Sequence, residues 1–396
     1  MIAQKRQFTR TLEHRLNESD LRIQVLIGPR QVGKSTALQQ LMGPGDQYLS
    51  ADSPSPLPHT VLTEMWEKSV VKSDGKTSLL IIDEAQKVPG WDQVIKNLWD
   101  THQKRPRLIL SGSSALLVEK GLTESLSGRF ELVRAEHWNF SEAHEIFGQS
   151  WQSFVEFGCY PGSQMYLKDL DRWGHYIRDS IVEPALGRDL LMLHPVEQPA
   201  LLRRLFAVAA SLPAQIVSLQ KLQGQLQGKG SLPTIQTYLS LLEKAFLVTG
   251  LEKYSTTALR LRKSSPKLIV HDNALVRAFE RPILAETTGT RMGRYFENTI
   301  GARFIESGWD VFYWNERNDE VDLVVHGPNN EKYAIEVKLG QVQRGELKGL
   351  DVFCKLHPEF TPCLVSGTNQ DDLLGIKTLN RDKVLGLSRT YSGTLF

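Results

Sequence analysis

Eight consecutive residues near the amino terminus have the spacing of a phosphate-binding loop. Gly28-Pro-Arg-Gln-Val-Gly33-Lys34-Ser35 follows the apolar segment 23–27 and precedes the helix-forming segment 36–42. The glycines let the backbone approach a polyphosphate closely, and N–H groups of the loop and of the helix N-terminus then face the phosphates. We expect Lys34 to reach the β- and γ-phosphates and Ser35 to hold Mg²⁺. The residues expected to contact ATP are Gly28, Pro29, Arg30, Gln31, Val32, Gly33, Lys34, Ser35 and Thr36.

A second candidate element is an apolar segment that ends in two acids. Leu79-Leu-Ile-Ile82 is followed by Asp83 and Glu84. Four apolar residues bounded by polar ones are typical of a parallel strand covered on both faces. Asp83 is expected to bind Mg²⁺ through its water shell, and Glu84 to orient and activate the attacking water. An exposed acidic pair that caps the next helix is the alternative, and the phosphate loop upstream favours the catalytic interpretation.

A third apolar segment, 107–110, is followed by Ser111-Gly-Ser113-Ser114. Small polar residues at the carboxyl end of a strand lie in the ligand crevice of a parallel sheet. We expect Ser113 to sense the γ-phosphate or position water, although an N-cap for the following helix explains such a serine nearly as well. Arg129 is a candidate finger for the nucleotide of a neighbouring subunit, or a plain surface arginine.

Four residues in the last third of the chain form a second candidate site. Asp322 lies in one predicted strand, Glu336 and Lys338 lie two residues apart in the next, and Glu297 lies in a preceding helix. Alternation along a strand places Glu336 and Lys338 on one face. Glu297, Asp322 and Glu336 are candidate Mg²⁺ ligands, and Lys338 is a candidate to position water or stabilise charge on a phosphate.

This layout resembles the PD-(D/E)xK pattern of restriction-endonuclease-like nucleases. Two alternatives stay open: an exposed cross-strand charge ladder on a non-catalytic sheet, and a genuine nuclease fold that does not cleave.

The whole chain has the composition of an ordinary globular protein. It has 396 residues, of which 41% are hydrophobic and 23% charged, and this length predicts two or three domains. No apolar run approaches the length needed to cross a membrane, and the amino terminus lacks a signal-peptide core. Three scattered cysteines fit neither a disulfide framework nor a zinc site. We therefore expect a cytoplasmic protein.

Positive charge is concentrated between Leu201 and Val270, although the net charge of the chain is only +2. The basic residues there are Arg203, Arg204, Lys221, Lys229, Lys244, Lys253, Arg260, Arg262, Lys263 and Lys267, opposed by Glu243 and Glu252. The local net charge of +8 is typical of a surface that binds phosphate backbones, and a solvated lysine-rich surface is the alternative.

The same region has the order of a winged helix-turn-helix. A helix over 218–227, a glycine turn, a second helix and a strand from Leu251 follow one another. Ile235, Tyr238, Leu239, Leu242 and Phe246 should form the buried face of the second helix. Thr234, Gln236, Thr237 and Ser240 should face DNA. A winged helix used only as a protein–protein spacer is the alternative.

Together these motifs resemble the AAA+ ATPases, and most closely a prokaryotic branch fused to a C-terminal domain of unknown function. The resemblance rests on residues 28–35, 79–86, 110–114 and 127–129, and on the turn 157–162, in which Cys159 replaces a usual glycine. It implies an α/β fold class: a P-loop AAA+ parallel sheet with a helical lid, then a winged helix-turn-helix, then a restriction-endonuclease-like α/β domain. The expected domains are 1–145, 146–205, 206–265 and 266–396.

The resulting hypothesis is an ATP-binding and ATP-hydrolysing protein that couples nucleotide state to DNA binding, remodelling or metal-dependent cleavage. One alternative is a DNA-remodelling motor or switch, such as one on branched DNA, with an inactive nuclease-like domain. Another is a signalling ATPase whose C-terminal module binds a protein partner. AAA+ kinship suggests a homo-oligomeric ring, and a dimer or monomer stays open. No membrane partner is expected.

Overall fold

The computed structural model describes residues 5–19, 21–70, 78–102, 105–113, 122, 124–193, 196–227, 230–255, 264–280, 288–373, 375–389 and 395–396. The chain divides into two compact units, Met1–Glu136 and His137–Phe396. Within the described ranges, no helix has the length and apolar character needed to span a bilayer. Cys159, Cys354 and Cys363 are all free thiols.

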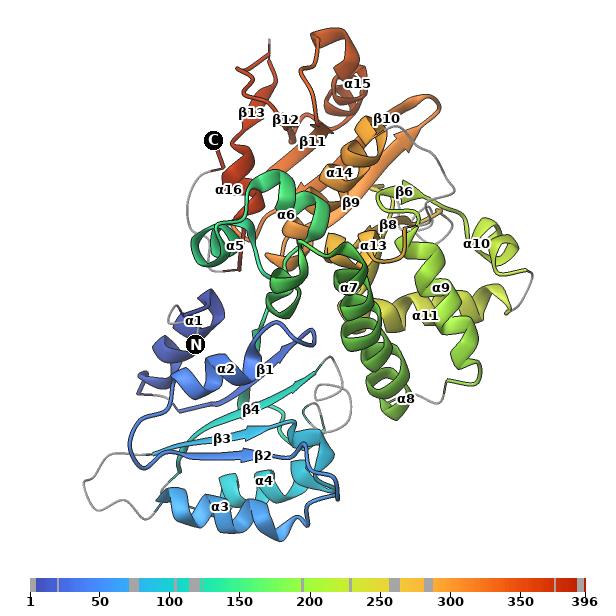
Figure 1. Ribbon diagram of the computed structural model, residues 1–396. Helices are drawn as coiled ribbons and strands as arrows, with labels where there is room; N and C mark the ends of the chain where they lie inside the picture. Colours follow the sequence, from blue (N-terminus) through green and yellow to red (C-terminus); the bar gives the residue numbers. More distant parts are fainter. Residues whose placement is uncertain are drawn as a thin grey trace. The chain divides into compact units, whose positions relative to one another are not determined.

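The N-terminal unit consists of a parallel sheet and flanking helices (Figure 1). Its elements are α1 (Gln7–Leu16), β1 (Ile23–Gly28), α2 (Lys34–Gln40), β2 (Gln47–Ser50), α3 (Thr60–Val70), β3 (Leu79–Asp83), the 3₁₀ turn η1 (Ala85–Lys87), α4 (Trp91–Thr101), β4 (Arg107–Ser113) and β5 (Phe130–Arg134). The strands are ordered β2-β3-β4-β1-β5, and every neighbouring pair is parallel. This sheet is the α/β P-loop core that the sequence predicts.

The central strands are apolar because both of their faces are covered. Every residue of β1 and β3 is buried, as expected for strands inside a parallel sheet. In Figure 1, α3 and α4 lie side by side along the sheet, and the rings of Trp66 and Trp99 meet edge to face with centroids 6.2 Å apart.

The register brings three strand ends together. Asp83 at the end of β3 pairs with Ser111 of β4, and Ser111 and Ser113 pair with Leu26 and Gly28 of β1. Because all the strands run in the same direction, their carboxyl ends share one edge of the sheet, where ligands of open α/β sheets bind.

The C-terminal unit begins with a run of short helices. They are α5 (Phe140–Phe147), α6 (Trp151–Phe157), the 3₁₀ turn η3 (Pro161–Tyr166), α7 (Leu170–His175), the π-helical turns η4 (Tyr176–Val182) and η5 (Ala185–Asp189), α8 (Leu190–Leu193) and α9 (Pro199–Ala210). α6 packs against α13 (Asn273–Arg277) and α14 (Thr288–Glu306), and α5 packs against α16 (Arg381–Leu385). The segment expected to be a lid therefore packs within the C-terminal unit.

A small antiparallel sheet follows, accompanied by three helices. Its strands are β6 (Gln215–Ile216), β7 (Val248–Leu251) and β8 (Lys267–Val270), in the order β6-β8-β7. α10 (Leu219–Gln225) and α11 (Leu232–Lys244) lie between β6 and β7 in sequence and pack with α9 (Figure 1). α11 buries Ile235, Tyr238, Leu239 and Leu242, as its spacing predicts. Residues 256–263, where the wing was expected, lie outside the described ranges.

The last part of the chain forms a mixed sheet between helices. Its elements are β9 (Asp310–Glu316), β10 (Asp319–His326), β11 (Lys332–Lys338), the 3₁₀ turn η6 (Arg344–Leu347), α15 (Lys348–Leu356), β12 (Thr361–Ser366) and β13 (Lys377–Leu379). The strands are ordered β13-β12-β11-β10-β9, with antiparallel pairs from β9 to β11 and parallel pairs from β11 to β13. α15 covers a core that includes Trp314, Val324, Phe353 and Leu364.

Candidate functional site

The backbone of the phosphate loop, residues 28–36 between β1 and α2, has the conformation that anion binding needs. A Cβ atom on Gly28 would lie 2.1 Å from the carbonyl oxygen of Ala135, so a side chain is excluded there. Gln31 and Gly33 both have positive φ, 60° and 95°. Backbone N–H groups in such turns form a concave anion-binding surface, and α2 begins at the end of this one.

Two basic side chains donate hydrogen bonds to backbone carbonyl oxygens of the phosphate loop. Lys34 is buried, and its ammonium donates hydrogen bonds to the carbonyl oxygens of Gly28 (2.8 Å) and Pro29 (2.7 Å). Arg6, also buried, donates to the carbonyl oxygens of Val32 (2.7 Å) and Glu136 (3.0 Å). The lysine is therefore positioned inside the loop, and the arginine fixes the loop backbone.

Three hydroxyl groups converge on the Asp83 carboxylate. Ser35 donates to Oδ2 over 2.7 Å, Tyr48 donates to the same oxygen over 2.6 Å, and Ser111 donates to Oδ1. Burial and the hydrogen bond to Asp83 raise the pKa of Tyr48 above its usual range. The Ser35 hydroxyl and the Asp83 carboxylate offer adjacent hard oxygen ligands, and this donor set fits Mg²⁺.

Glu84 is held in a strained conformation directly after Asp83. Its φ is 56°, which is uncommon for a residue with a side chain. Its carboxylate accepts a hydrogen bond of 2.6 Å from the amide of Gln86. The backbone conformation and the hydrogen bond from Gln86 together orient the Glu84 carboxylate. The predicted role of Glu84 in positioning water needs a carboxylate with a fixed orientation.

Ser113 and Arg129, the other residues predicted for this site, lie at different ends of the parallel strands. The backbone of Ser113 lies beside Gly28 at the correct edge of the sheet, and Ser114 falls outside the described ranges. Arg129 precedes β5, and its carbonyl oxygen accepts a hydrogen bond from Ile23 at the start of β1. Arg129 therefore lies at the amino-terminal end of β1, whereas the phosphate loop lies at its carboxyl end. The arginine forms a two-pronged ion pair with Asp100, at 2.7 and 2.9 Å.

Arg6 and Tyr48 were not predicted for this site, and Ser111 was predicted to lie in the ligand crevice without its contact to Asp83. A signal existed for Ser111, because Leu79-Leu-Ile-Ile82 and Arg107-Leu-Ile-Leu110 align as parallel strands and place Asp83 and Ser111 side by side. Arg6 and Tyr48 follow no motif, since their roles depend on elements packed from elsewhere in the chain.

The second candidate site contains a buried lysine that sequence reasoning counted as surface charge. Lys267 is 1% exposed at the start of β8. Its ammonium lies 2.5 Å from Oε1 of Glu297 in α14 and 3.6 Å from Oδ1 of Asp322 in β10. Glu320 lies 3.4 Å away. Lys267 therefore does not contribute to the predicted basic surface.

The second site also contains Glu336 and Lys338. We define the nuclease-like cluster as Lys267, Glu297, Asp322, Glu336 and Lys338. Glu336 and Lys338 lie on one face of β11, and their side chains form an ion pair of 2.6 Å. Asp322 lies at an irregularity in the pairing of β9 with β10, and its Oδ2 accepts from the Val337 N–H over 2.9 Å. Strand irregularities of this kind often redirect a side chain toward a site.

The electrostatics of the cluster show that its carboxylates affect one another. Burial and then the Asp322 charge raise the pKa of both Glu297 and Glu336. The four predicted residues are therefore gathered in one place rather than spread along an exposed ladder.

The carboxylates of the cluster do not, however, fit a divalent cation. Three ligand atoms within 4.8 Å of one another could hold a metal ion. Among the described residues, His137, His271 and Glu306 form such a group, and the nuclease-like carboxylates do not. An ammonium group lies against Glu297 and Asp322 instead. The predicted Mg²⁺ role of Glu297, Asp322 and Glu336 therefore finds no support in the geometry.

The His137, His271 and Glu306 group is a hydrogen-bonded hub. Both Nδ1 atoms contact Oε1 of Glu306, at 3.1 Å for His137. The two Nε2 atoms contact the hydroxyls of Tyr160 (3.1 Å) and Thr249 (2.9 Å). Although burial acts in the opposite direction, the histidines hold the pKa of Glu306 well below its usual range. Each ring nitrogen of His137 and His271 therefore has a protein partner.

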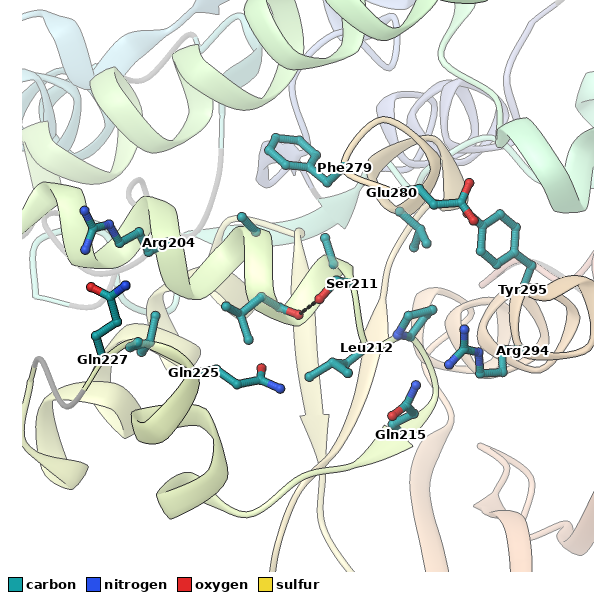
Figure 2. Close-up of a pocket in the computed structure, with 16 residues that line it drawn as sticks. Arg204, Ser211, Leu212, Gln215, Gln225, Gln227, Phe279, Glu280, Arg294 and Tyr295 are labelled. Atoms are coloured by element: carbon teal, nitrogen blue, oxygen red, sulfur yellow. Dashed lines mark hydrogen bonds between the residues drawn. The ribbon is translucent and has the colours of Figure 1, made fainter. Parts of the chain in front are cut away.

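A groove of about 720 Å³ lies between α9, α10, α13 and α14. Figure 2 shows Arg204 and Gln227 on one side of it and Arg294 and Tyr295 on the other. Glu280, also in the lining, lies within ion-pair distance of Arg277 and Arg291. The groove therefore offers positive charge, amides and aromatic rings rather than an acid–base pair.

The comparisons with known families match the chain in three parts. Residues 20–144 match the family profile of an AAA domain. Residues 148–284 and 292–382 match two domains of unknown function, DUF8612 and DUF4143. The N-terminal unit, with its phosphate loop and five-stranded parallel sheet, is thus an AAA-type P-loop domain.

Several proteins are similar to parts of this chain. An uncharacterized protein of Mycobacterium tuberculosis, Rv2008c, is 25% identical over 85% of this chain and 74% of its own length. An uncharacterized protein of Methanocaldococcus jannaschii, MJ1544, is 23% identical over 82% and 76%. Two RuvB variants of Thermotoga maritima cover 61% of this chain and 87% and 86% of their own, at TM-scores of 0.33 and 0.34 and identities of 13% and 12%.

The substitution Tyr48→Phe tests the contacts of Asp83. Loss of a hydrogen bond to a charged group should lower the free energy of unfolding of the N-terminal unit by about 1–2 kcal/mol. Urea unfolding without nucleotide measures this change. Thr101→Val, which removes an exposed hydroxyl on α4, is the control and should have a smaller effect. Equal stability of Tyr48→Phe and wild type would contradict the assigned contact.

Proposed function

We propose that this chain is an ATP-hydrolysing switch or motor that acts on DNA and couples its nucleotide state to DNA binding. The observation that carries the ATPase half is the 2.7 Å contact between the Ser35 hydroxyl and the Asp83 carboxylate, with Lys34 inside the adjacent loop. Each of these groups comes from the position that the motifs require.

The residues of the loop have separate tasks in this proposal. Backbone N–H groups of the loop and the Lys34 ammonium bind the β- and γ-phosphates. Ser35 and Asp83 would hold Mg²⁺, which when bound neutralises charge on the phosphate oxygens. Glu84, whose carboxylate Gln86 holds, orients the attacking water. Arg129 faces away from its own loop and would serve a neighbouring copy in a homo-oligomer after releasing Asp100.

Glu84→Gln and Lys34→Ala test the ATPase half. Glu84→Gln removes the base and should lower ATP turnover at least about 100-fold while ATP still binds. Lys34→Ala should lose both binding and turnover. Steady-state phosphate release and binding of a fluorescent ATP analogue measure these effects.

Exposed residues of α3 supply the matched controls, Glu64→Gln and Lys68→Ala, which should behave as wild type. Unchanged turnover in Lys34→Ala would refute this assignment of the site.

The DNA half of the proposal is supported by the order of elements around the small sheet. Helix α9, strand β6, helices α10 and α11, and strands β7 and β8 follow in the order of a winged helix. In this interpretation α11 is the recognition helix. Its side chains Gln236, Thr237 and Ser240 are exposed, and Thr234 is partly covered by its contact with Ser231.

Positive charge near these helices also supports DNA binding. Arg204 on α9 and Lys221 on α10 are exposed, and Arg294 lines the groove beside them (Figure 2). Such side chains suit phosphate contacts, which position a protein on DNA without reading its sequence.

Salt dependence of DNA binding tests this half. The logarithm of the association constant should fall linearly with the logarithm of salt concentration. Arg204→Ala and Lys221→Ala should each reduce the slope by about one. Fluorescence anisotropy with a labelled duplex and with a branched DNA measures it. Lys355→Ala, exposed on α15, is the control. A salt-independent affinity, or none, would favour the alternative of a signalling ATPase with a protein partner.

The nuclease-like cluster favours the version of this function without cleavage. The Lys267 ammonium lies against the carboxylates of Glu297 and Asp322. We therefore propose remodelling or switching on DNA as the action of the chain.

A further inference from the structure

Lys267 lies against two of the carboxylates of the nuclease-like cluster. Its ammonium contacts carboxylates from two elements, Glu297 of α14 and Asp322 of β10, and it also donates to the Asp322 carbonyl oxygen over 3.1 Å. We propose that the Lys267 ammonium takes the place of a divalent cation here, so that the wild-type cluster excludes Mg²⁺ and Mn²⁺ and removal of the lysine side chain creates a site for them. This proposal is independent of the function proposed for the loop.

Neighbouring contacts prevent Lys267 from withdrawing. β8 is the middle strand of its sheet, where Lys267 pairs with Ile216 on one side and Leu251 on the other. The Asn298 side chain accepts from the Val270 N–H (2.9 Å) and donates to the Val270 carbonyl oxygen (2.7 Å). This amide joins β8 to α14 one residue away from Glu297. The backbone that carries the lysine and the helix that carries the carboxylate are thus held together.

Three carboxylates lie around the Lys267 ammonium, those of Glu297 at 2.5 Å, Glu320 at 3.4 Å and Asp322 at 3.6 Å. A second cation would meet repulsion from a buried ammonium that no counter-ion in solvent screens. Glu336, the remaining carboxylate, already pairs with Lys338. Lys267 and Lys338 thus bring two ammonium groups to the four carboxylates of Glu297, Asp322, Glu320 and Glu336.

Removal of the lysine side chain would leave Lys338 as the remaining ammonium group among these contacts. Glu297 and Asp322 would then be buried carboxylates without a cation, which is strongly unfavourable. Carboxylate oxygens on two neighbouring elements are ligands that Mg²⁺ and Mn²⁺ accept. The variant Lys267→Gln should consequently be less stable than wild type and should recover stability when Mn²⁺ is added.

The experiment compares Mn²⁺ binding by four full-length proteins: wild type, Lys267→Gln, Lys267→Gln with Asp322→Asn, and Lys253→Gln. Mn²⁺ titration by electron paramagnetic resonance and by thermal unfolding is carried out without nucleotide. Mn²⁺ bound at the phosphate loop is common to all four and cancels in the comparison. Lys253, a partly buried lysine 3.9 Å from Glu316, is the matched control.

The proposal expects Lys267→Gln to gain a Mn²⁺ site at least about tenfold tighter than any in wild type. Its melting temperature should rise with Mn²⁺, and Asp322→Asn in the same chain should abolish both effects. Lys253→Gln should match wild type. Failure of Lys267→Gln to bind additional Mn²⁺ would overturn the proposal, and so would an Asp322-dependent Mn²⁺ site in wild type.

The single variant Asp322→Asn keeps the test decisive if Lys267→Gln does not fold. Equal Mn²⁺ binding by wild type and Asp322→Asn supports exclusion of the metal. Weaker Mn²⁺ binding by Asp322→Asn, or Mn²⁺-dependent DNA cleavage by wild type that Asp322→Asn removes, overturns it. Neither result depends on ATP turnover, so this proposal and the ATPase half of the proposed function fail separately.

Discussion

The hydrogen bonds that converge on the Asp83 carboxylate are the interaction on which the N-terminal unit is organised. They join β2, β3 and β4 to the first turn of α2, through Tyr48, Ser111 and Ser35. A carboxylate buried this deeply is tolerated because each hydroxyl donates a charge-assisted hydrogen bond. The arrangement depends on parallel strands that end at one edge of the sheet. The same edge carries the phosphate loop and Glu84. The packing that forms the sheet therefore also positions the residues of the proposed chemistry.

The C-terminal unit is also organised by buried charge, and α14 carries both of its centres. Glu297 near the middle of this helix meets Lys267, and Glu306 at its end meets His137 and His271. Asn298 fixes the helix to β8 between these two points. In both centres a carboxylate of α14 meets basic side chains from other elements of the C-terminal unit.

The sequence predicts site residues well where they lie within a few consecutive positions of the chain. The phosphate loop and Asp83-Glu84 each lie within a few consecutive residues, and the strands that carry them are continuous apolar runs. Lys267 could not be assigned in this way, because its burial depends on α14 and β10, which lie well beyond it in the chain. Counting it as surface charge overstated the basic region of the winged helix. Tyr48 and Arg6 were missed for the same reason, since long-range packing and not spacing brings them to the loop.

The central claim is that nucleotide state and DNA binding are coupled, and the Glu84→Gln variant isolates that coupling because it should hold ATP without hydrolysing it. The direct measurement is the dissociation constant of this variant for a labelled DNA at fixed salt, with ATP and Mg²⁺ and then with ADP and Mg²⁺. The account predicts affinities that differ at least about fivefold between the two nucleotides. Equal affinities in the two states would contradict it.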